Sequence, residues 1–544
     1  MKLGIDMEQF FGRKPILSIL KKRILDLKEG YRQNVALLGC WAIGKTVLMQ
    51  KAIVDLADDK IIAVYIDLEN QDFQDIYEKI SGRLLFHYAK LHQIPLSEDF
   101  KSLRHTIKSK WPATARCLKK IEAALSHNRA RDAFRELFSL PQTFAKEADV
   151  YCVMFLDEFH SLRELAVPGA FQELGKKVMT QNRCLYVMAS SLPVVAQRIL
   201  SEELSLLFGN FEIIPVEVFS PHESQNFLSA YLTDIGLKEE LKNFLADFTG
   251  GHPLFLSLIA REIHSLCRVY QQQEVFVPLL TQALENLLFQ PWGLLSNHFS
   301  LKVGQLSNPK GNLLSGRLLL ALANGKQKFQ EIVGQVGVKP SQVRQNLNYL
   351  IEQNIVVKNG SFFYLEDKLF RFWIQHVFQH REKSLDFDLS QRQEQFRRAV
   401  QEAIDHHGLQ SRKDLATRVL ELISCFEDEI CYINGRRYRL PVFQGIIPAK
   451  DRKIMEGCLE VIRASTEAGD WFVVLKSQAI SENDINTVIA ESKKRAARPR
   501  KCILISLGET DENVRLRALQ ERMWVWNEGE LNTLLNIFNK PYIL

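Results

Sequence analysis

Short apolar runs alternate with amphipathic stretches over the first 220 residues of this chain. The runs are rich in β-branched residues and occupy residues 35–38, 61–68, 150–156, 184–189 and 211–219. Continuous apolar runs of this length are typical of parallel strands that are buried on both faces. Amphipathic segments such as 45–58 and 167–181 separate them. The pattern predicts an α/β sheet with helices on both faces, and the segment 70–145 predicts extra helices inserted before the third strand.

Beyond residue 219 the pattern becomes mainly helical. "SPHE" at 220–223 has the form of a capping box, with serine at the N-cap and proline in the first turn. Helical periodicity continues to about residue 300, and three short helices are expected within 311–354. "IVVKNGSFFYL" at 355–365 then predicts a hairpin with an Asn359-Gly360 turn. Three helices followed by a hairpin predict a winged helix.

The remainder of the chain divides into a charged helical linker and a last α/β region. In this region we expect a hairpin around "YINGRRYRL", strands at 458–465, 471–476 and near 501–507 and 523–527, and helices between and after them. The predicted domains are an α/β core at 1–219, a helical region at 220–300, a winged helix at 301–380, a linker at 381–427 and a second α/β domain at 428–544.

Composition narrows the class of protein. With 544 residues and 46% hydrophobic content the chain exceeds what one core can use, so several domains are expected. No apolar segment has the length of a membrane span or signal h-region, so we expect a cytoplasmic protein without a membrane partner. The nine cysteines contain no C-x-x-C pair, which argues against a zinc site or a disulfide framework. A net charge of +6 is too small to indicate a polyanion partner by itself.

The stretch "GCWAIGKT", residues 39–46, matches G-x-x-x-x-G-K-[ST] between a predicted strand and a predicted helix. Such a loop points backbone N–H groups and a helix N-terminus at a phosphate. Lys45 would reach the β and γ phosphates, and the Thr46 hydroxyl would bind Mg²⁺. The predicted nucleotide contacts in and beside this loop are Gly39, Cys40, Trp41, Ala42, Ile43, Gly44, Lys45, Thr46 and Val47.

An acidic pair follows the third predicted strand. Asp157 and Glu158 stand at its carboxyl end, where α/β sheets bind ligands. Asp157 would hold Mg²⁺, while Glu158 would act as the catalytic base that orients the attacking water. The next strand ends in Ser190 and Ser191. Ser190 is in a position to sense the γ-phosphate, although small polar residues also simply end strands.

These motifs together resemble the archaeal-type ATPases of the STAND branch of P-loop NTPases, relatives of AAA+ proteins. The resemblance rests on "FFGRKPIL", "GCWAIGKT", "FLDEFHSL", "MASS" and "GGHPLFL" and covers about the first 380 residues. It implies ATP as the nucleotide. It also implies that Arg13, after Gly12, lies beside the nucleotide, and that the Gly251-His252-Pro253 turn of the lid closes over it.

One position departs from the family pattern. Members usually carry an arginine just before the last strand, in a stretch resembling L-[FY]-G-R, whereas this chain has Asn210 there. Loss of an arginine finger removes roughly 10³ or more in rate, so slow hydrolysis is expected. Arg183 and Arg198 are candidate substitutes, and the sequence does not rank them.

The third helix of the predicted winged helix has two faces. Val343, Leu347 and Leu350 would face the core, which leaves a polar face of residue types that read bases and phosphates. That face consists of Ser341, Arg344, Gln345 and Asn348. Its single arginine leaves two interpretations open: contact with duplex DNA, or an autoinhibitory contact within the protein, as in many STAND proteins.

The element order after residue 428 resembles the PD-(D/E)xK nuclease-like fold. Glu460 and Lys476 fit two positions of its site, but Val474 stands where an acid is required. Because an apolar side chain cannot bind a hard cation, we expect a degenerate nuclease site unless Glu467 or Asp470 substitutes. The run 493–501, beginning Lys493, Lys494 and Arg495, is a candidate DNA-binding patch, with Arg436, Arg437 and Arg439 beside it.

Three functions remain open at this stage. The first is a slow ATP-dependent switch, in which nucleotide opens the lid and winged helix and frees the last domain for a protein partner or for self-assembly. The second is a DNA-binding ATPase that recruits or remodels DNA complexes. The third is a nuclease gated by ATP, which needs the missing metal ligand to be replaced.

Overall fold

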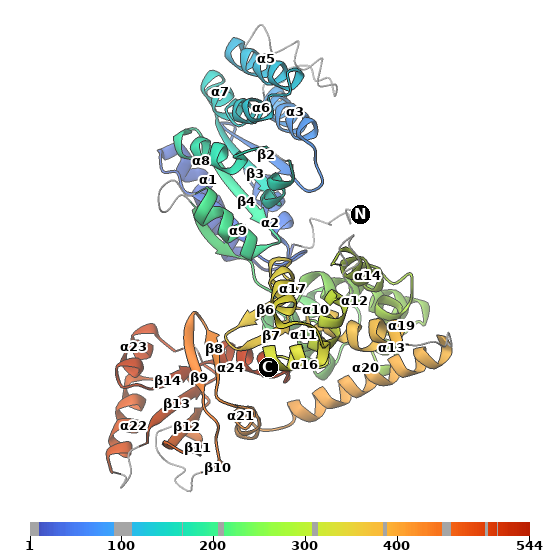
Figure 1. Cartoon of the computed structure of the whole chain (residues 1–544), viewed down its shortest axis with the longest axis vertical. Coiled ribbons are helices and arrows are strands. Elements are labelled where there is room, and N and C mark those ends of the chain that lie inside the picture. The colour runs from blue at the N-terminus through green and yellow to red at the C-terminus, as the bar shows by residue number, and fades with distance from the viewer. Residues whose placement is uncertain are drawn as a thin grey trace. The chain divides into compact units, whose positions relative to one another are not determined.

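The computed structural model divides the chain into two compact units, each described here by itself (Figure 1). It describes residues 10–91, 111–165, 167–204, 211–306, 314–383, 389–448, 458–494, 499–508 and 510–543. The first unit contains the chain up to Val218, together with 252–254 and 352–354, and the second contains the rest.

A five-stranded parallel sheet forms the centre of the first unit. Its order is β2-β3-β4-β1-β5, so the first strand in the sequence lies between the fourth and the fifth. The strands are β1 (Asn34–Leu38), β2 (Ile61–Asp67), β3 (Tyr151–Asp157), β4 (Cys184–Ser190) and β5 (Phe211–Pro215). All five expected strands are present, although β5 ends four residues before the predicted limit at 219. The predicted α/β class with a parallel sheet is confirmed.

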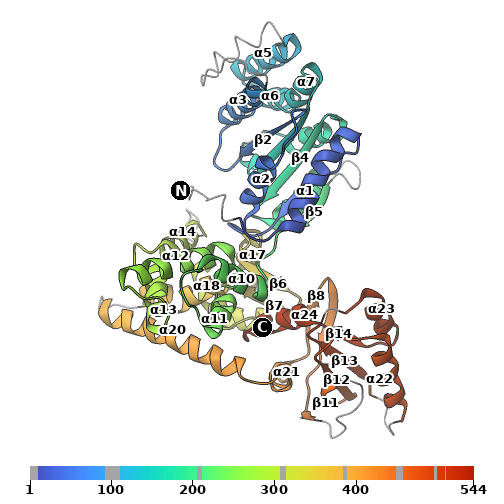
Figure 2. The ribbon, with the colours of Figure 1, turned by 180° about the vertical axis from the view of Figure 1, so that it is seen from behind.

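Helices cover both faces of this sheet, as Figures 1 and 2 show. One face carries α1 (Lys14–Asp26) and α2 (Lys45–Val54), whose apolar side chains pack on alternate residues of the strands. The other face carries α8 (Ala170–Thr180), α9 (Pro193–Arg198) and the inserted helices. Since alternate residues of a strand point to opposite faces, strands buried on both faces are apolar throughout, which explains the unbroken runs in the sequence.

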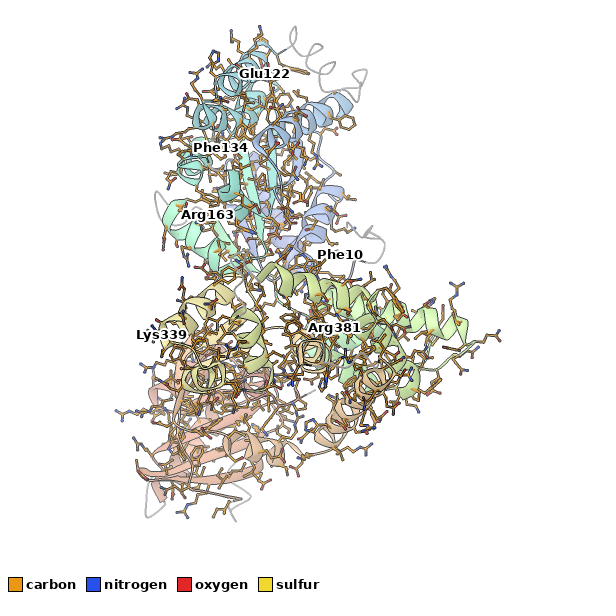
Figure 3. The ribbon with its side chains drawn as sticks, turned by 45° about the vertical axis from the view of Figure 1, so that its right-hand side comes forward. Phe10, Glu122, Phe134, Arg163, Lys339 and Arg381 are labelled. Atoms are coloured by element: carbon orange, nitrogen blue, oxygen red, sulfur yellow. The ribbon has the colours of Figure 1, made fainter. Side chains whose placement is uncertain are left out.

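The predicted insertion between β2 and β3 is helical in its described part. It contains α3 (Phe73–Leu91), α5 (Pro112–Ser126), α6 (Ala130–Leu137) and α7 (Leu140–Glu147). Phe134, labelled in Figure 3, is fully buried in the core that these helices share with the sheet. The insertion therefore thickens one face of the sheet.

The second unit begins with helices. They are α10 (Pro221–Tyr231), α11 (Glu239–Phe248), α12 (Pro253–Val269), α13 (Val277–Leu284) and α14 (Leu294–Leu306). Ser220 and Glu223 form the predicted capping box at the start of α10. This reciprocal bonding satisfies two backbone N–H groups that the first turn leaves unpaired.

Three helices and a hairpin follow in the predicted order. They are α15 (Leu314–Ala323), α16 (Phe329–Val336), α17 (Pro340–Glu352), β6 (Val356–Asn359) and β7 (Phe362–Leu365). The predicted turn was one residue too early: Asn359 pairs with Phe362 inside the ladder, and Gly360 and Ser361 form the turn. Gly360, with φ of 60°, lies where an added Cβ would meet the carbonyl oxygen of Ile430 at 2.0 Å. The close approach of another strand therefore requires glycine there.

Helices then lead to a second sheet. After α18 (Lys368–Trp373) and α19 (Gln379–Lys383), the linker contains α20 (Leu389–Ser411) and α21 (Leu415–Ile423). The last region holds the expected hairpin, β8 (Glu429–Ile433) with β9 (Arg436–Leu440), and a five-stranded sheet of order β10-β11-β12-β13-β14. These strands are β10 (Gly445–Pro448), β11 (Cys458–Thr466), β12 (Gly469–Lys476), β13 (Lys501–Ser506) and β14 (Trp524–Trp526). β10 has no counterpart among the strands expected from the sequence.

The second sheet is mixed and is also covered on both faces. β10, β11 and β12 are antiparallel, whereas β12, β13 and β14 are parallel. One face packs against α21, the β8–β9 hairpin and α24 (Glu528–Ile537), and the other against α22 (Glu482–Lys494) and α23 (Glu512–Gln520). Among the residues described in either unit, no helix is both long and apolar enough to span a bilayer.

Candidate nucleotide site

The loop at residues 39–46 has the geometry of an anion cradle. It connects the carboxyl end of β1 to α2, and Gly44 is the N-cap of that helix with φ of 104°. A left-handed conformation of this kind favours glycine. Gly39 has a different reason to lack a side chain, because a Cβ there would lie 2.2 Å from the carbonyl oxygen of Val216. Backbone N–H groups at the start of α2 therefore face the loop, with the positive end of the helix dipole behind them.

Lys45 is buried inside this loop. The residue is only 4% exposed. Its Nζ donates to the carbonyl oxygens of Gly39 at 2.9 Å and Cys40 at 2.7 Å. Burial lowers the pKa of Lys45, although the carboxylates of Glu158 and Asp157 oppose that shift. The oxygens of Gly39 and Cys40 that accept these bonds are neutral, and a phosphate would be a stronger partner for the ammonium.

Thr46 and Asp157 meet beside Lys45. The Thr46 hydroxyl donates to Asp157 Oδ2 at 2.6 Å, and Asp157, at the end of β3, is 3% exposed. A hydroxyl and a carboxylate at one point are hard oxygen donors of the kind that Mg²⁺ prefers. These two residues, predicted as metal ligands, are brought together in the structure and fit a magnesium ion.

Glu158 is held in one orientation by the end of β4. Its Oε2 accepts the backbone N–H of Ser191 at 2.7 Å. Its own backbone has φ of 49°, a left-handed conformation that a non-glycine residue adopts only at some cost. Burial raises the pKa of Glu158, with Lys45 acting in the opposite direction. A carboxylate with a raised pKa, next to the phosphate loop, has the properties of a general base.

His160 joins Glu158 to Ser190. His160 Nδ1 lies 2.9 Å from Ser190 Oγ and 3.3 Å from Glu158 Oε2. Burial lowers the pKa of His160 to about 4, with the charges of Lys45 and Arg163 acting in the same direction. The imidazole is therefore neutral at pH 7. Ser190 itself is fully buried and accepts the N–H of Leu192, so its hydroxyl supports the end of the strand.

Tyr65 is a site residue that the sequence analysis missed. It lies on β2, the strand beside β3, and its hydroxyl donates to Asp157 Oδ2 at 2.8 Å. Burial, together with the Asp157 carboxylate, raises the pKa of Tyr65, so the phenol keeps its proton. The only signal in the sequence was a phenol in an otherwise aliphatic strand, and that signal does not identify its partner.

Arg13 and His252 occupy positions near the rim of the loop. Arg13 has φ of 60°, precedes α1, and donates to the carbonyl oxygen of Glu217, just beyond β5. His252 is 8% exposed and its Nε2 lies 3.0 Å from the carbonyl oxygen of Trp41. Pro253 begins α12 directly after it. The bond to Trp41 places the imidazole of His252, a residue of the first unit, beside the phosphate loop.

The candidate substitute arginines differ in position. Arg183 precedes β4 and binds Asp149, which precedes β3, so it lies at the amino edge of the sheet. The phosphate loop is at the carboxyl edge, and Arg183 is therefore ruled out as a finger within its own chain. Arg198 lies on α9, beyond the carboxyl end of β4, and is exposed. Asn210 lies outside the described residues.

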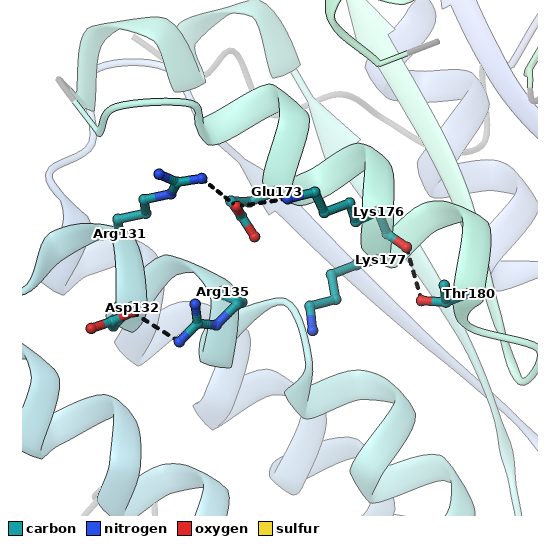
Figure 4. A pocket seen from close by; sticks show the side chains of 7 residues that line it. All are labelled: Arg131, Asp132, Arg135, Glu173, Lys176, Lys177 and Thr180. Atoms are coloured by element: carbon teal, nitrogen blue, oxygen red, sulfur yellow. Dashed lines mark hydrogen bonds and ion pairs between the residues drawn. The ribbon is translucent and has the colours of Figure 1, made fainter. Parts of the chain in front are cut away.

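A hollow of about 640 Å³ lies away from this loop, between α6 and α8 (Figure 4). Its lining is strongly charged and consists of Arg131, Asp132, Arg135, Glu173, Lys176, Lys177 and Thr180. Arg131 and Lys176 both bind the buried Glu173, at 2.8 and 3.1 Å, while Arg135 binds Asp132. Because three of the four cations in the lining are paired with carboxylates, we assign the hollow no part in phosphate binding.

The candidate DNA-binding residues fall into two groups. In α17, Val343, Leu347 and Leu350 are buried as predicted, and the predicted polar face is exposed at Ser341, Arg344, Gln345 and Asn348. The Arg344 guanidinium lies 5.3 Å from the centre of the Phe329 ring. In the last region, Lys493 and Lys494 end α22, and Arg495 lies outside the described residues.

Near the hairpin, Arg439 is already engaged. It binds Asp428 through two bonds, of 2.7 and 2.6 Å, whereas Arg437 is exposed and Arg436 is half-buried. A bidentate ion pair neutralises the guanidinium. The hairpin thus offers less positive charge to a polyanion than its sequence indicates.

The structure does not bring Glu460 and Lys476 together. Glu460 pairs with Leu475, and residues directly opposite each other in an antiparallel ladder share a face. Successive side chains of a strand point to opposite faces, so Lys476, the residue after Leu475 on β12, points to the face opposite Glu460. These two residues cannot form one metal site, and the prediction that they occupy one site is corrected.

Lys476 instead has a carboxylate partner that the sequence analysis did not consider. Its Nζ binds Asp484 Oδ2 at 2.6 Å, and both residues are buried. Ser481 also donates to Asp484 Oδ2, from its backbone N–H and from its hydroxyl, each at 2.8 Å. Burial would raise the pKa of Asp484, but the bonds from Lys476 and Ser481 hold it below the usual value.

The two proposed substitute acids are also far from Lys476. Glu467 lies in the turn that precedes β12 and Asp470 near its start, where Asp470 binds Arg463. Lys476 is the last residue of that strand, so six residues of extended chain, roughly 20 Å, separate Asp470 from it. Neither acid can replace the missing ligand beside Lys476.

The chain is similar to several solved structures at low sequence identity. No family model and no curated protein matches the chain. Among solved structures, a Walker-type ATPase of Pyrococcus abyssi has a TM-score of 0.48 and 16% identity over 68% of this chain and 96% of its own. The ORC2 protein of Aeropyrum pernix has a TM-score of 0.41 and 12% identity over 72% and 95%. The RuvB Holliday junction branch migration motor of Thermotoga maritima has a TM-score of 0.33 and 11% identity over 70% and 97%.

Proposed function

We propose that this protein is a Mg²⁺-dependent ATPase that hydrolyses ATP slowly and acts as a nucleotide-controlled switch of the STAND type. The observation that carries the proposal is the convergence of Lys45, Thr46, Asp157 and Glu158 at the carboxyl edge of one sheet. Phosphate transfer needs a cation, a metal site and a base that orients water, and these four residues supply all three requirements.

Each residue has a separate part in this reaction. The N–H groups of the loop and the Lys45 ammonium bind the β and γ phosphates, after Lys45 exchanges its bonds to Gly39 and Cys40 for phosphate oxygens. Thr46 and Asp157 would hold Mg²⁺, which supplies charge neutralisation on the phosphate oxygens. Glu158, with its raised pKa, orients the attacking water and accepts its proton.

The Glu158 carboxylate has to leave the Ser191 N–H, or share it, before it can bind water. This bond, 2.7 Å long, holds the base at the end of β4. We infer that hydrolysis is slow for this reason as well as for the absence of arginine at position 210. Slow turnover suits a switch, because the nucleotide state then persists long enough to be read by a partner.

The domains beyond 219 would read the nucleotide state. We assign 220–300 to a lid, 301–380 to a winged helix, 381–427 to a linker and 428–544 to a nuclease-like domain without nuclease activity. His252, which bonds to Trp41 within the first unit, directly precedes the lid helix in the chain, and we propose that it passes the nucleotide state to the lid through the backbone. A protein partner or self-assembly would receive the signal. The Lys476–Asp484 pair argues against a nuclease, because it occupies the lysine with a carboxylate.

A DNA-binding ATPase is the second candidate. The exposed polar face of α17 favours it, since serine, glutamine, asparagine and arginine are side chains that contact bases and phosphates. Arg344 is the single cation among the four predicted residues, and it lies over the Phe329 ring. With so little positive charge, a protein or intramolecular contact is the better-supported use of this face.

The test is phosphate release from ATP by the wild-type protein and by Glu158→Gln, with and without duplex DNA. We expect slow turnover that DNA does not change, and a loss of roughly 10²- to 10⁴-fold in the variant, because Gln cannot accept the proton. ATP affinity should remain close to wild type. Glu202→Gln, on an exposed position of the same unit, is a matched control.

The outcomes separate the candidates. Turnover that duplex DNA stimulates, and that Arg344→Ala makes insensitive to DNA, would replace the switch by the DNA-binding ATPase. Wild-type protein that binds ATP without hydrolysing it would remove the enzyme assignment. Failure to bind ATP at all would refute both.

A further inference from the structure

Asp157 accepts three hydrogen bonds, two of them from side chains on other elements. Its Oδ2 accepts the Thr46 hydroxyl at 2.6 Å and the Tyr65 hydroxyl at 2.8 Å, and its Oδ1 accepts the N–H of Glu158 at 3.1 Å. Of these donors, Thr46 is a predicted metal ligand and Glu158 is the adjacent residue in the chain. Tyr65 has no part in the phosphate or metal contacts assigned above, which raises the question of what its hydroxyl does.

The position of Tyr65 directs it at the metal ligand. Asp157 pairs with Asp67 on β2, and Tyr65 precedes Asp67 by two residues, so Tyr65 and Asp157 point to the same face of the sheet. That is the face covered by α2, whose first turn carries Thr46. Thr46 and Tyr65 therefore both reach Asp157 Oδ2, one from the helix and one from the neighbouring strand.

We propose that Tyr65 is a positioning residue for magnesium, which orients the Asp157 carboxylate so that it and Thr46 bind the ion together with nucleotide. The inference rests on the proposed function, because it needs the Mg²⁺–nucleotide complex. Groups that hydrogen-bond to a metal's ligands, rather than to the metal, commonly contribute 10- to 100-fold to metal affinity. Thr46 would offer a hydroxyl lone pair to the ion, and its O–H could still donate to Asp157. Tyr65 supplies the second side-chain bond to Asp157 Oδ2.

Substitution by phenylalanine removes the hydroxyl without moving the ring. Arg83 donates to the backbone carbonyl oxygen of Tyr65, and its guanidinium lies 5.8 Å from the centre of the ring. Both interactions are available to phenylalanine. Tyr65→Phe therefore tests the hydroxyl alone.

The experiment measures binding of fluorescent N-methylanthraniloyl-ADP to the full-length protein, in excess MgCl₂ and in EDTA. We expect Tyr65→Phe to weaken binding about 10-fold in Mg²⁺ and to leave binding in EDTA unchanged. The Mg²⁺ concentration that gives half-maximal binding should rise by a similar factor. Tyr151→Phe is the matched control, because its hydroxyl lies at the other end of β3, 3.5 Å from the carbonyl oxygen of Lys28. It should behave as wild type.

A double variant determines whether Tyr65 acts through Asp157. In an Asp157→Asn background, adding Tyr65→Phe should cause no further change in the ratio of the two dissociation constants. Equal weakening in Mg²⁺ and EDTA would overturn the proposal and indicate a structural role for the hydroxyl. Unchanged binding in both conditions would also overturn it. If the wild-type protein bound no nucleotide, the proposed function itself would fail. If the wild-type protein bound nucleotide and Tyr65→Phe bound it equally well, only the role of Tyr65 would fail.

Discussion

Two buried lysines at the carboxyl edges of two sheets show how the partner of a charge decides its use. Lys45 is 4% exposed and Lys476 is 8% exposed, and each lies close to the start of a helix. Lys45 donates to two backbone carbonyl oxygens, whereas Lys476 binds the carboxylate of Asp484 at 2.6 Å. Neutral partners leave the charge of Lys45 available to an anion, whereas the Asp484 carboxylate neutralises the charge of Lys476.

The difference also separates binding from stability. A buried charge bound only to dipoles keeps much of its desolvation cost, and a phosphate can recover it. A buried ion pair with additional hydrogen bonds is already satisfied, so removal of one partner exposes the other to the full cost. The first arrangement suits a ligand site and the second suits a fixed element of the fold.

The largest expected effect is on the stability of the second unit. Lys476→Met should lower the free energy of unfolding by about 3–5 kcal/mol, because it leaves the Asp484 carboxylate buried without a cation. Adding Asp484→Asn should restore most of this loss, since the amide oxygen still accepts from Ser481. Chemical denaturation of the single and double variants measures both values. A single variant as stable as wild type would show that solvent reaches the pair.

The same substitution at the other lysine should act on binding instead. Lys45→Met should reduce ATP affinity roughly 100-fold, about 3 kcal/mol, through loss of charged bonds to phosphate. The unfolding free energy of the nucleotide-free protein should stay within about 1 kcal/mol of wild type or exceed it, because burial lowers the pKa of Lys45 and disfavours its charged form. Calorimetric titration measures the ATP affinity, and chemical denaturation measures the unfolding free energy. If Lys45→Met destabilised the protein as much as Lys476→Met, the proposed difference between the two lysines would be wrong.

The smallest expected effect is a dependence on pH. The pKa of Asp484 is held below its usual value, so its ion pair stabilises the fold above the unfolded-state pKa, near 4, and this contribution is lost as pH falls through the lower, folded-state value. In Lys476→Met the sign reverses, since protonation of an unpaired buried carboxylate relieves its cost. The stability gap between wild type and Lys476→Met should therefore narrow from pH 7 toward pH 4. A gap that stays constant over this range would exclude Asp484 as its source.

The first unit was largely predictable because its signals are local. The five strands follow from unbroken apolar runs, and the loop at 39–46 follows from glycine, lysine and threonine at fixed spacing. Asp157 follows from its place after a strand, since the carboxyl ends of parallel strands meet at one edge. What the pattern did not reveal was Tyr65, whose role depends on β2 lying beside β3.

The last region was less predictable. Its strands were found, except β10, a four-residue segment that ends in proline and has no alternating pattern. Glu460 and Lys476 were placed in one site because both lie on neighbouring strands, but a register that pairs Glu460 with Leu475 turns them to opposite faces. A register shifted by one residue would have placed Glu460 and Lys476 on the same face. The sequence of either strand alone does not determine that register.

The sequence by itself determined the alternation of strands and helices, the phosphate loop, and the identity of the acids that follow β3. Each of these depends on neighbours within about ten residues, where backbone geometry and spacing decide the outcome. Only the tertiary structure decided that Tyr65 contacts Asp157 and that His160 lies between Glu158 and Ser190. It also decided that Asp484 neutralises the charge of Lys476. Those contacts depend on strand order, register and the packing of helices on a sheet, which arise from the whole chain burying its apolar surface at once.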